Sequence, residues 1–176
     1  IWYDDPASLA PKCKIIFTIV GYPQDVEETY FGEKGLLKTA KPGTIFADMT
    51  TSSPILAKKI YDGAKKKECF SVDAPVSGGD IGAKNGTLSI MAGGDEKAFK
   101  ELEPFFACMG KTWALQGGAG AGQHTKMANQ IAVAANLFGT VEAVCYAEAA
   151  GLDPQKMLSA IGGGAAGSWQ ILNNGP

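Results

Sequence analysis

The sequence has a single histidine, and no two of its four cysteines have the close spacing of a zinc site. Structural zinc sites draw their ligands from closely spaced Cys and His residues, so we predict no metal site. Apolar patterns surround three of the cysteines, which predicts buried, reduced thiols in an intracellular protein. We therefore expect a cytoplasmic protein, with the mitochondrial matrix as the alternative in a eukaryote. The residues concerned are His124, Cys13, Cys69, Cys108 and Cys145.

Charge of either sign is not in excess, and no long apolar run occurs. The 16 basic and 18 acidic residues leave a net charge of −2, which argues against nucleic acid as a partner. The one dense basic run, residues 65–67, is expected to be a solvated helix end. No window has the roughly 18 uninterrupted apolar residues of a membrane span, because Asn136, Gly139 and Thr140 break the best candidate. Neither nucleic acid nor a membrane is predicted as a partner.

Short apolar runs rich in β-branched residues alternate with helical patterns. Ser53 and Pro54 are typical of a helix start, and that helix should run to about Lys66. Asp95 is expected to cap a second helix. Strands that alternate with helices predict a Rossmann-like α/β fold with a mainly parallel sheet. The expected strands are residues 14–20, 44–48, 69–73, 87–93 and 111–115.

The pattern changes after Gly122. No proline interrupts the chain from there to Ala150, which predicts one helix of roughly 40 Å. Its apolar residues surround much of the circumference, so we expect burial on several sides, between two domains or against a second subunit. We expect residues 1–120 to form a partial dinucleotide-binding domain. Residues 121–176 would be the long helix and the start of an all-α domain.

The stretch "GGAGAGQHTKMANQ" at residues 117–130 has two interpretations, a phosphate-binding turn or a strand-to-helix junction. The dinucleotide motif Gly-x-Gly-x-x-Gly, counted from Gly118, needs a third glycine where the sequence has Gln123. The acidic residue that should follow a second strand would lie inside the long helix. The spacing therefore favours the junction.

Lys126 lies one turn into the long helix, with Asn129 and Gln130 on nearly the same face. A lysine beside two amides can transfer a proton while the amides orient a substrate. Periodicity alone favours a solvated polar helix end, and both interpretations stay open at this point.

A second polar segment follows the strand that ends at Asp73. Ser77, Gly78 and Gly79 are expected at the carboxyl end of the sheet, where open α/β sheets bind ligands. Unobstructed backbone N–H groups suit a carboxylate. The alternative is an ordinary strand-to-helix loop.

Two of these segments, "DAPVSGGDIGAKNGTLSIMAGGD" and "GAGQHTKMANQ", together resemble the β-hydroxyacid dehydrogenases, the group that contains 3-hydroxyisobutyrate dehydrogenase and tartronate semialdehyde reductase. The resemblance extends to "TIVGYPQDVEETYFGEKGLL" and "FADMTTSSP". It implies oxidation of a small β-hydroxy acid, or reduction of the matching semialdehyde, with NAD or NADP. Lys126 would be the general acid/base, and Ser77, Gly78 and Gly79 would hold the substrate carboxylate.

The resemblance also implies cofactor contacts. Thr51 would lie near the reacting carbon, and the cofactor cleft would be lined by Val20, Gly21, Tyr22 and Pro23. The substrate amide is ambiguous. Many relatives have an asparagine four residues after the lysine, but this sequence has Gln130 there and Asn129 one residue earlier.

The sequence contains neither the family's opening strand with its glycine motif nor the residue that selects NAD or NADP. It also lacks the end of the helical domain. We therefore expect an internal fragment that is inactive alone, from a parent enzyme that forms a homo-oligomer through the long helix. The substrate and the choice between NAD and NADP stay open. Two alternatives are a non-catalytic dinucleotide-binding or oligomerisation module, and an imine reductase, against which Lys126 counts.

Overall fold

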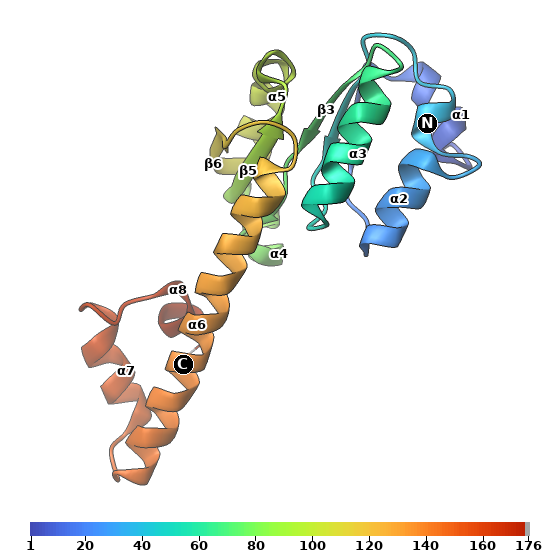
Figure 1. The fold of residues 1–176 in the computed structure, drawn as a ribbon. Coiled ribbons are helices and arrows are strands. Elements are labelled where there is room, and N and C mark those ends of the chain that lie inside the picture. The colour runs from blue at the N-terminus through green and yellow to red at the C-terminus, as the bar shows by residue number, and fades with distance from the viewer. Residues whose placement is uncertain (175–176) are drawn as a thin grey trace. The chain divides into compact units, whose positions relative to one another are not determined.

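The computed structural model describes residues 1–174. The chain divides into two compact units, the first from Ile1 to Lys126 and the second from Met127 onward. Figure 1 labels the elements of both units.

The first unit is built on a six-stranded sheet with the order β1-β2-β3-β5-β4, in which β6 pairs with β5. The pairs β1–β2, β2–β3 and β5–β6 are parallel, whereas β5 runs antiparallel to both β3 and β4. The predicted Rossmann-like, mainly parallel sheet is confirmed. The strands are β1 (Ile15–Thr18), β2 (Ile45–Asp48), β3 (Phe70–Asp73), β4 (Val76–Ser77), β5 (Leu88–Gly94) and β6 (Gly110–Leu115).

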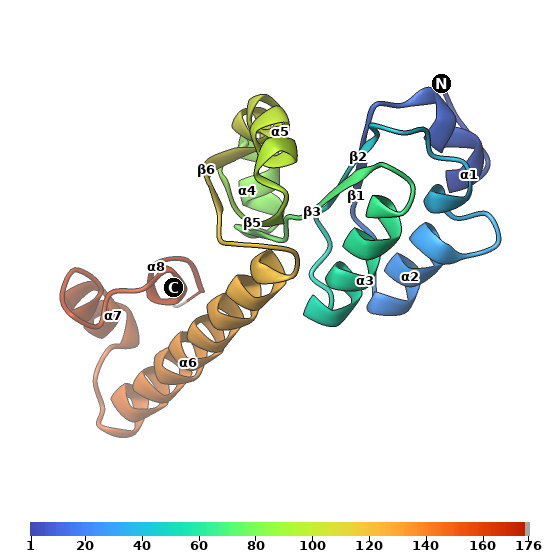
Figure 2. The same cartoon turned by 45° about the horizontal axis from the view of Figure 1, so that its top comes forward.

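Five α-helices lie wholly within this unit. Figures 1 and 2 show them beside the sheet. Ser53 caps the third, accepting from the backbone N–H groups of Ile55 and Leu56, and Asp95 caps the fifth in the same way. Both predicted caps are confirmed. The helices are α1 (Pro6–Leu9), α2 (Pro23–Phe31), α3 (Pro54–Lys65), α4 (Gly79–Asn85) and α5 (Glu96–Met109), with short 3-10 turns η1 (Ala10–Lys12) and η2 (Leu36–Lys38).

Strand β2 is buried on both faces because helices cover both. Ile45 and Ala47 belong to one core cluster with Phe106 of α5. Phe46, which points the other way, belongs to a second cluster with Ile60 of α3. The alternation of side chains along a strand thus explains why the sequence shows a continuous apolar run here rather than an apolar–polar pattern.

The second unit begins within α6 (Ala121–Ala149), which is followed by α7 (Pro154–Gly162) and α8 (Trp169–Asn174). The single long helix was predicted and is confirmed. Ala147, Leu158 and Ile171 are buried, one from each helix.

Within the described chain α6 is not buried on several sides, and its cover by a second subunit stays a prediction. Ile131 is 67% exposed and Phe138 is 72% exposed, and other apolar side chains of the helix are exposed as well. Its apolar circumference exceeds what two short helices can cover.

By length and composition alone, α6 is also able to cross a membrane. The prediction considered unbroken apolar runs, whereas the mean hydropathy of a helix can be high despite scattered polar residues. Core helices of soluble proteins can have the same length and mean hydropathy.

The cysteines are free, as predicted, but only Cys69 is buried and Cys13 is half-buried. The prediction of burial is wrong for Cys108 and Cys145, which are exposed. Cys108 comes two residues after the buried Phe106, and two residues turn an α-helix by about 200°. An apolar helical pattern therefore did not place this thiol in the core.

Candidate active site

Three polar residues end the parallel strands side by side. The register pairs Thr18 of β1 with Asp48 of β2, and Asp48 with Asp73 of β3. Asp48 Oδ1 accepts from Thr18 Oγ1 at 3.0 Å and from the backbone N–H of Thr50 at 3.1 Å. The Tyr30 hydroxyl lies 2.9 Å from Thr18 Oγ1 and extends this buried network. Burial raises the pKa of the Asp48 carboxyl, and the hydrogen bonds from Thr50 and Thr18 oppose that shift.

The loop after β2 is tied to two other segments. The backbone N–H of Val20 donates to Thr50 Oγ1 at 3.0 Å. Gln123, in the first turn of α6, donates from Nε2 to the Thr50 carbonyl at 2.7 Å and accepts at Oε1 from the backbone N–H of Ser52 at 2.8 Å. Gln123 is buried, whereas Thr51, between the two bonded residues, is exposed. These bonds place the predicted cofactor residues Val20 and Thr51 beside the start of α6.

Asp73 holds the start of α6. Its Oδ1 accepts from the backbone N–H of Gly120 at 2.7 Å, and its Oδ2 accepts from that of Gln123 at 2.9 Å. The packing is close, because a Cβ on Gly122 would lie 2.4 Å from the Met91 carbonyl oxygen and 2.5 Å from that of Asp73. The N–H groups that a phosphate would need are therefore bonded to a carboxylate of the protein, which supports the junction interpretation of the glycine cluster.

Burial raises the pKa of Asp73 to about 6 from its ordinary value of 3.8, against the opposing effect of the two backbone hydrogen bonds. Because the folded-state pKa is raised, its contribution to the free energy of unfolding is fully present below about pH 4 and is lost as the pH rises through about 6. The shift corresponds to at most about 3 kcal/mol.

Urea denaturation of the full-length protein and its Asp73→Asn variant tests this linkage. The free energy of unfolding of the wild type, minus that of the variant, should decrease by up to about 3 kcal/mol between about pH 4 and about pH 7. Other titrating groups are common to both proteins and cancel in the difference. A difference that stays constant with pH would contradict the raised pKa.

Lys126 is the sixth residue of α6, and its side chain is only 8% exposed. Burial lowers the pKa of its ammonium group, and no other cause contributes. The described residues provide Lys126 Nζ with neither an ion pair nor a hydrogen bond; their four ion pairs all involve other lysines. A largely buried lysine without a carboxylate partner is costly and is uncommon outside functional sites.

The predicted carboxylate-binding segment begins four residues after Asp73. Ser77 is half-buried on β4, where it pairs with Ser89 of β5. Gly78 and Gly79 are exposed and have φ values of 132° and 64°, in the region that favours glycine. Their backbone conformation explains why glycine is needed at both positions.

The remaining predicted residues lie at two places. Tyr22 and Pro23 begin α2, and the backbone N–H of Tyr22 donates to Asp25 Oδ2 at 2.7 Å. Gly21 is exposed, as is Tyr22 at 74%. The amide residues lie on α6 within the second unit, where Asn129 Nδ2 donates to Gln130 Oε1 at 3.0 Å. Each amide thus has one hydrogen-bonding group engaged by the other.

The two parts of the chain match two models of dehydrogenase domains. Residues 1–118 match the NAD binding domain of 6-phosphogluconate dehydrogenase, and residues 120–176 match the model described as NAD-binding of NADP-dependent 3-hydroxyisobutyrate dehydrogenase. This chain belongs to the β-hydroxyacid dehydrogenase family. The resemblance seen in the motifs is thereby confirmed, and with it NAD or NADP as the cofactor class.

Three similar proteins illustrate the match. The chain is 54% identical over 176 residues to the uncharacterized oxidoreductase YkwC of Bacillus subtilis, covering 100% of this chain and 61% of that protein. It is 46% identical over 154 residues to 2-hydroxy-3-oxopropionate reductase of Escherichia coli, covering 88% of this chain and 53% of that protein. A solved structure of Mycobacterium tuberculosis 3-hydroxyisobutyrate dehydrogenase with L-serine superposes with a TM-score of 0.88 at 30% identity, covering 99% of this chain and 59% of that chain. The chain therefore spans 61% or less of the length of these relatives.

Within this member of the β-hydroxyacid dehydrogenases, the described residues fit one part of a dinucleotide. Ile19 and Tyr22 expose apolar side chains at the carboxyl edge of β1, where ligands bind in such sheets. A flat ring such as nicotinamide suits an apolar surface of this kind. The glycine cluster does not fit the pyrophosphate, because Asp73 already accepts from the backbone N–H groups of Gly120 and Gln123.

Two residues that hold the candidate site together from within were not predicted from the sequence. The sequence pattern indicates only that Asp73 ends a strand and that Gln123 breaks the glycine motif. A signal was present, because both are polar residues at positions where the pattern predicts burial: the end of an apolar strand and the first turn of a mostly apolar helix. Their partners are 47 to 73 residues away in the sequence, which no local pattern reveals.

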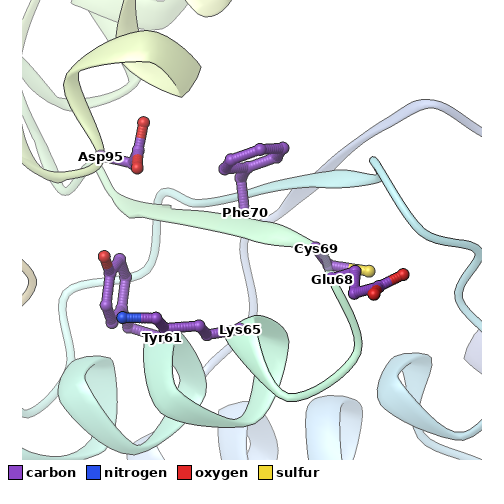
Figure 3. Close-up of a pocket in the computed structure, with 6 residues that line it drawn as sticks. All are labelled: Tyr61, Lys65, Glu68, Cys69, Phe70 and Asp95. Atoms are coloured by element: carbon purple, nitrogen blue, oxygen red, sulfur yellow. The ribbon is translucent and has the colours of Figure 1, made fainter.

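A pocket of about 320 Å³ lies elsewhere in the first unit, at the amino end of β3. Figure 3 shows Tyr61 and Lys65 of α3 on one side of β3, with Phe70 and Asp95 on the other side. Its lining, which includes none of the predicted site residues, consists of Tyr61, Lys65, Glu68, Cys69, Phe70 and Asp95. Among the described residues, no group of three or more His, Cys, Asp or Glu side chains is arranged to hold a metal ion.

Proposed function

We propose that the full-length protein containing this chain is an NAD(P)-dependent oxidoreductase that interconverts a small β-hydroxy acid and the corresponding semialdehyde. The family supports the reaction type. The names of two relatives, a 2-hydroxy-3-oxopropionate reductase and a 3-hydroxyisobutyrate dehydrogenase, support the substrate class.

The observation that carries the proposal is the environment of Lys126. The residue is only 8% exposed, burial lowers the pKa of its ammonium group, and no described carboxylate forms an ion pair with it. A lysine ordinarily keeps its proton up to a pH of about 10.4, so a lowered pKa brings proton exchange nearer to neutral pH. A general acid/base works best under that condition.

NAD(P), when bound, supplies the acceptor or donor of the hydride. In the oxidative direction, Lys126 Nζ takes the hydroxyl proton of the substrate as the hydride leaves the adjacent carbon, and in the reductive direction it returns that proton to the alkoxide. The backbone N–H groups of Gly78 and Gly79 and the Ser77 hydroxyl hold the substrate carboxylate. Asn129 or Gln130 orients the substrate hydroxyl.

The cofactor lies along Val20, Gly21, Tyr22, Pro23 and Thr51. We further propose that the protein forms a homo-oligomer through α6, because the exposed apolar side chains of that helix need cover. A cytoplasmic location, or the mitochondrial matrix in a eukaryote, suits such an enzyme.

A substrate screen of the full-length protein tests the reaction type. Tartronate semialdehyde, methylmalonate semialdehyde, succinic semialdehyde and glyoxylate are each offered with NADH and with NADPH, and loss of the reduced cofactor is followed by absorbance. We expect oxidation of one cofactor with at least one of the four. If none is turned over, the scaffold is non-catalytic and the proposal fails.

A further inference from the structure

Gln123 joins segments that are distant in the sequence. Its side chain is 2% exposed and bonds to the backbone on both sides of Thr51, to the Thr50 carbonyl at 2.7 Å and to the Ser52 N–H at 2.8 Å. The same residue donates its own backbone N–H to Asp73 at 2.9 Å. Lys126 follows three residues later on the same helix.

A neutral primary amide suits this position. It donates and accepts at the same time, which matches a carbonyl and an N–H group presented together, and it brings no charge into a buried place. Neither partner belongs to the hydrophobic core, since both are backbone groups of the loop that carries Thr51. The loop is tied further, because Thr50 Oγ1 accepts from the backbone of Val20.

We propose that Gln123 is a positioning residue, which fixes the Thr51 loop to the turn of α6 that carries Lys126 so that the cofactor side of the site and the lysine keep one geometry. The inference rests on the proposed roles of Thr51 and Lys126. A displacement of about 1 Å in a catalytic constellation costs on the order of 100-fold in rate.

Two substitutions of similar size separate positioning from space-filling. Gln123→Met removes both hydrogen bonds. Gln123→Glu, when ionised, accepts from Ser52 but cannot donate to the Thr50 carbonyl; when protonated, its O–H donates to Thr50 and its C=O accepts from Ser52. Acid should therefore rescue the glutamate variant and not the methionine variant.

The experiment measures kcat and KM for cofactor and substrate in the full-length protein across the pH range where the wild type is active. We expect kcat/KM of Gln123→Met to be lower than wild type by about 100-fold at every pH. The activity of Gln123→Glu relative to wild type should rise as the pH falls. Wild type is measured at each pH because other ionisable side chains lie nearby, namely those of Asp73, Asp48, His124 and Lys126.

Hydrogen exchange of the backbone amides at residues 50–52 gives a readout that does not need turnover. The amide of Ser52 should exchange faster in Gln123→Met than in wild type. A methionine variant within threefold of wild type, or a glutamate variant whose relative activity is flat with pH, would overturn the positioning role. An inactive wild type would refute the proposed function instead, and the exchange data would still decide whether Gln123 restrains the loop.

Discussion

Lys126→Ala in the full-length protein is expected to lower kcat by about 10²- to 10⁴-fold while the dissociation constant for NAD(P)H stays within a few-fold of wild type. A positioned acid/base contributes about that factor. The lysine is buried without a described ion-pair partner, so its removal breaks no salt bridge that would disturb the fold. Stopped-flow turnover and fluorescence titration of the cofactor measure the two quantities.

The pH dependence gives a second readout. In the oxidative direction the wild type should gain activity as the pH rises through the pKa of Lys126, which burial lowers below the ordinary lysine value. This rise of activity with pH should be absent in the Lys126→Ala variant. Lys111→Ala, which removes an exposed lysine on β6, is the matched control and should leave both readouts unchanged. If Lys126→Ala kept more than a tenth of the activity, Lys126 would have no acid/base role.

Gly122→Ala is expected to lower the free energy of unfolding of the full-length protein by about 3 kcal/mol, the upper end of the usual cost of overpacking, or to prevent folding. The added Cβ would lie 2.4 Å from the Met91 carbonyl oxygen and 2.5 Å from that of Asp73, and both oxygens belong to the backbone of the sheet. They cannot turn aside as a flexible side chain would. The junction between the sheet and α6 would have to open, and the bonds to Asp73 would lengthen or break.

The control lies in the same cluster. Gly118 has no atom within 4 Å of an added Cβ, so Gly118→Ala should change stability by no more than about 0.5 kcal/mol. Thermal and urea denaturation of the two variants, side by side, measures the contrast. Equal stabilities would show that the close approach at Gly122 is not maintained in solution.

Local signals predicted much of the fold. Ser53 and Asp95 cap the predicted helices because their side-chain oxygens accept from N–H groups only two or three residues away. The core positions Leu56, Ile60 and Ala64 follow from helical spacing alone and are buried. Each of these features depends on neighbours close in the sequence.

Features that depend on distant neighbours were not predicted. Strand β4 has only two residues, and its existence depends on pairing with β5. The apolar circumference of α6 shows that the helix needs cover but does not identify what provides it, and the described chain provides only part of it. In the candidate site, the resemblance of the motifs to the family predicted which residues take part. The bonds of Asp73 and Gln123, which fix the geometry, join positions about 50 to 70 residues apart.

The two bonds from Asp73 to the start of α6 also set the angular phase of that helix. Each residue added to an α-helix rotates the rest of the helix by about 100°. One residue inserted between Gln123 and Lys126 would therefore rotate the Lys126 side chain by about 100° about the helix axis, even with every other contact preserved. Insertions and deletions at this junction in homologous chains should therefore lie before Gly120, the first residue bonded to Asp73, where Gly118 has open space around it.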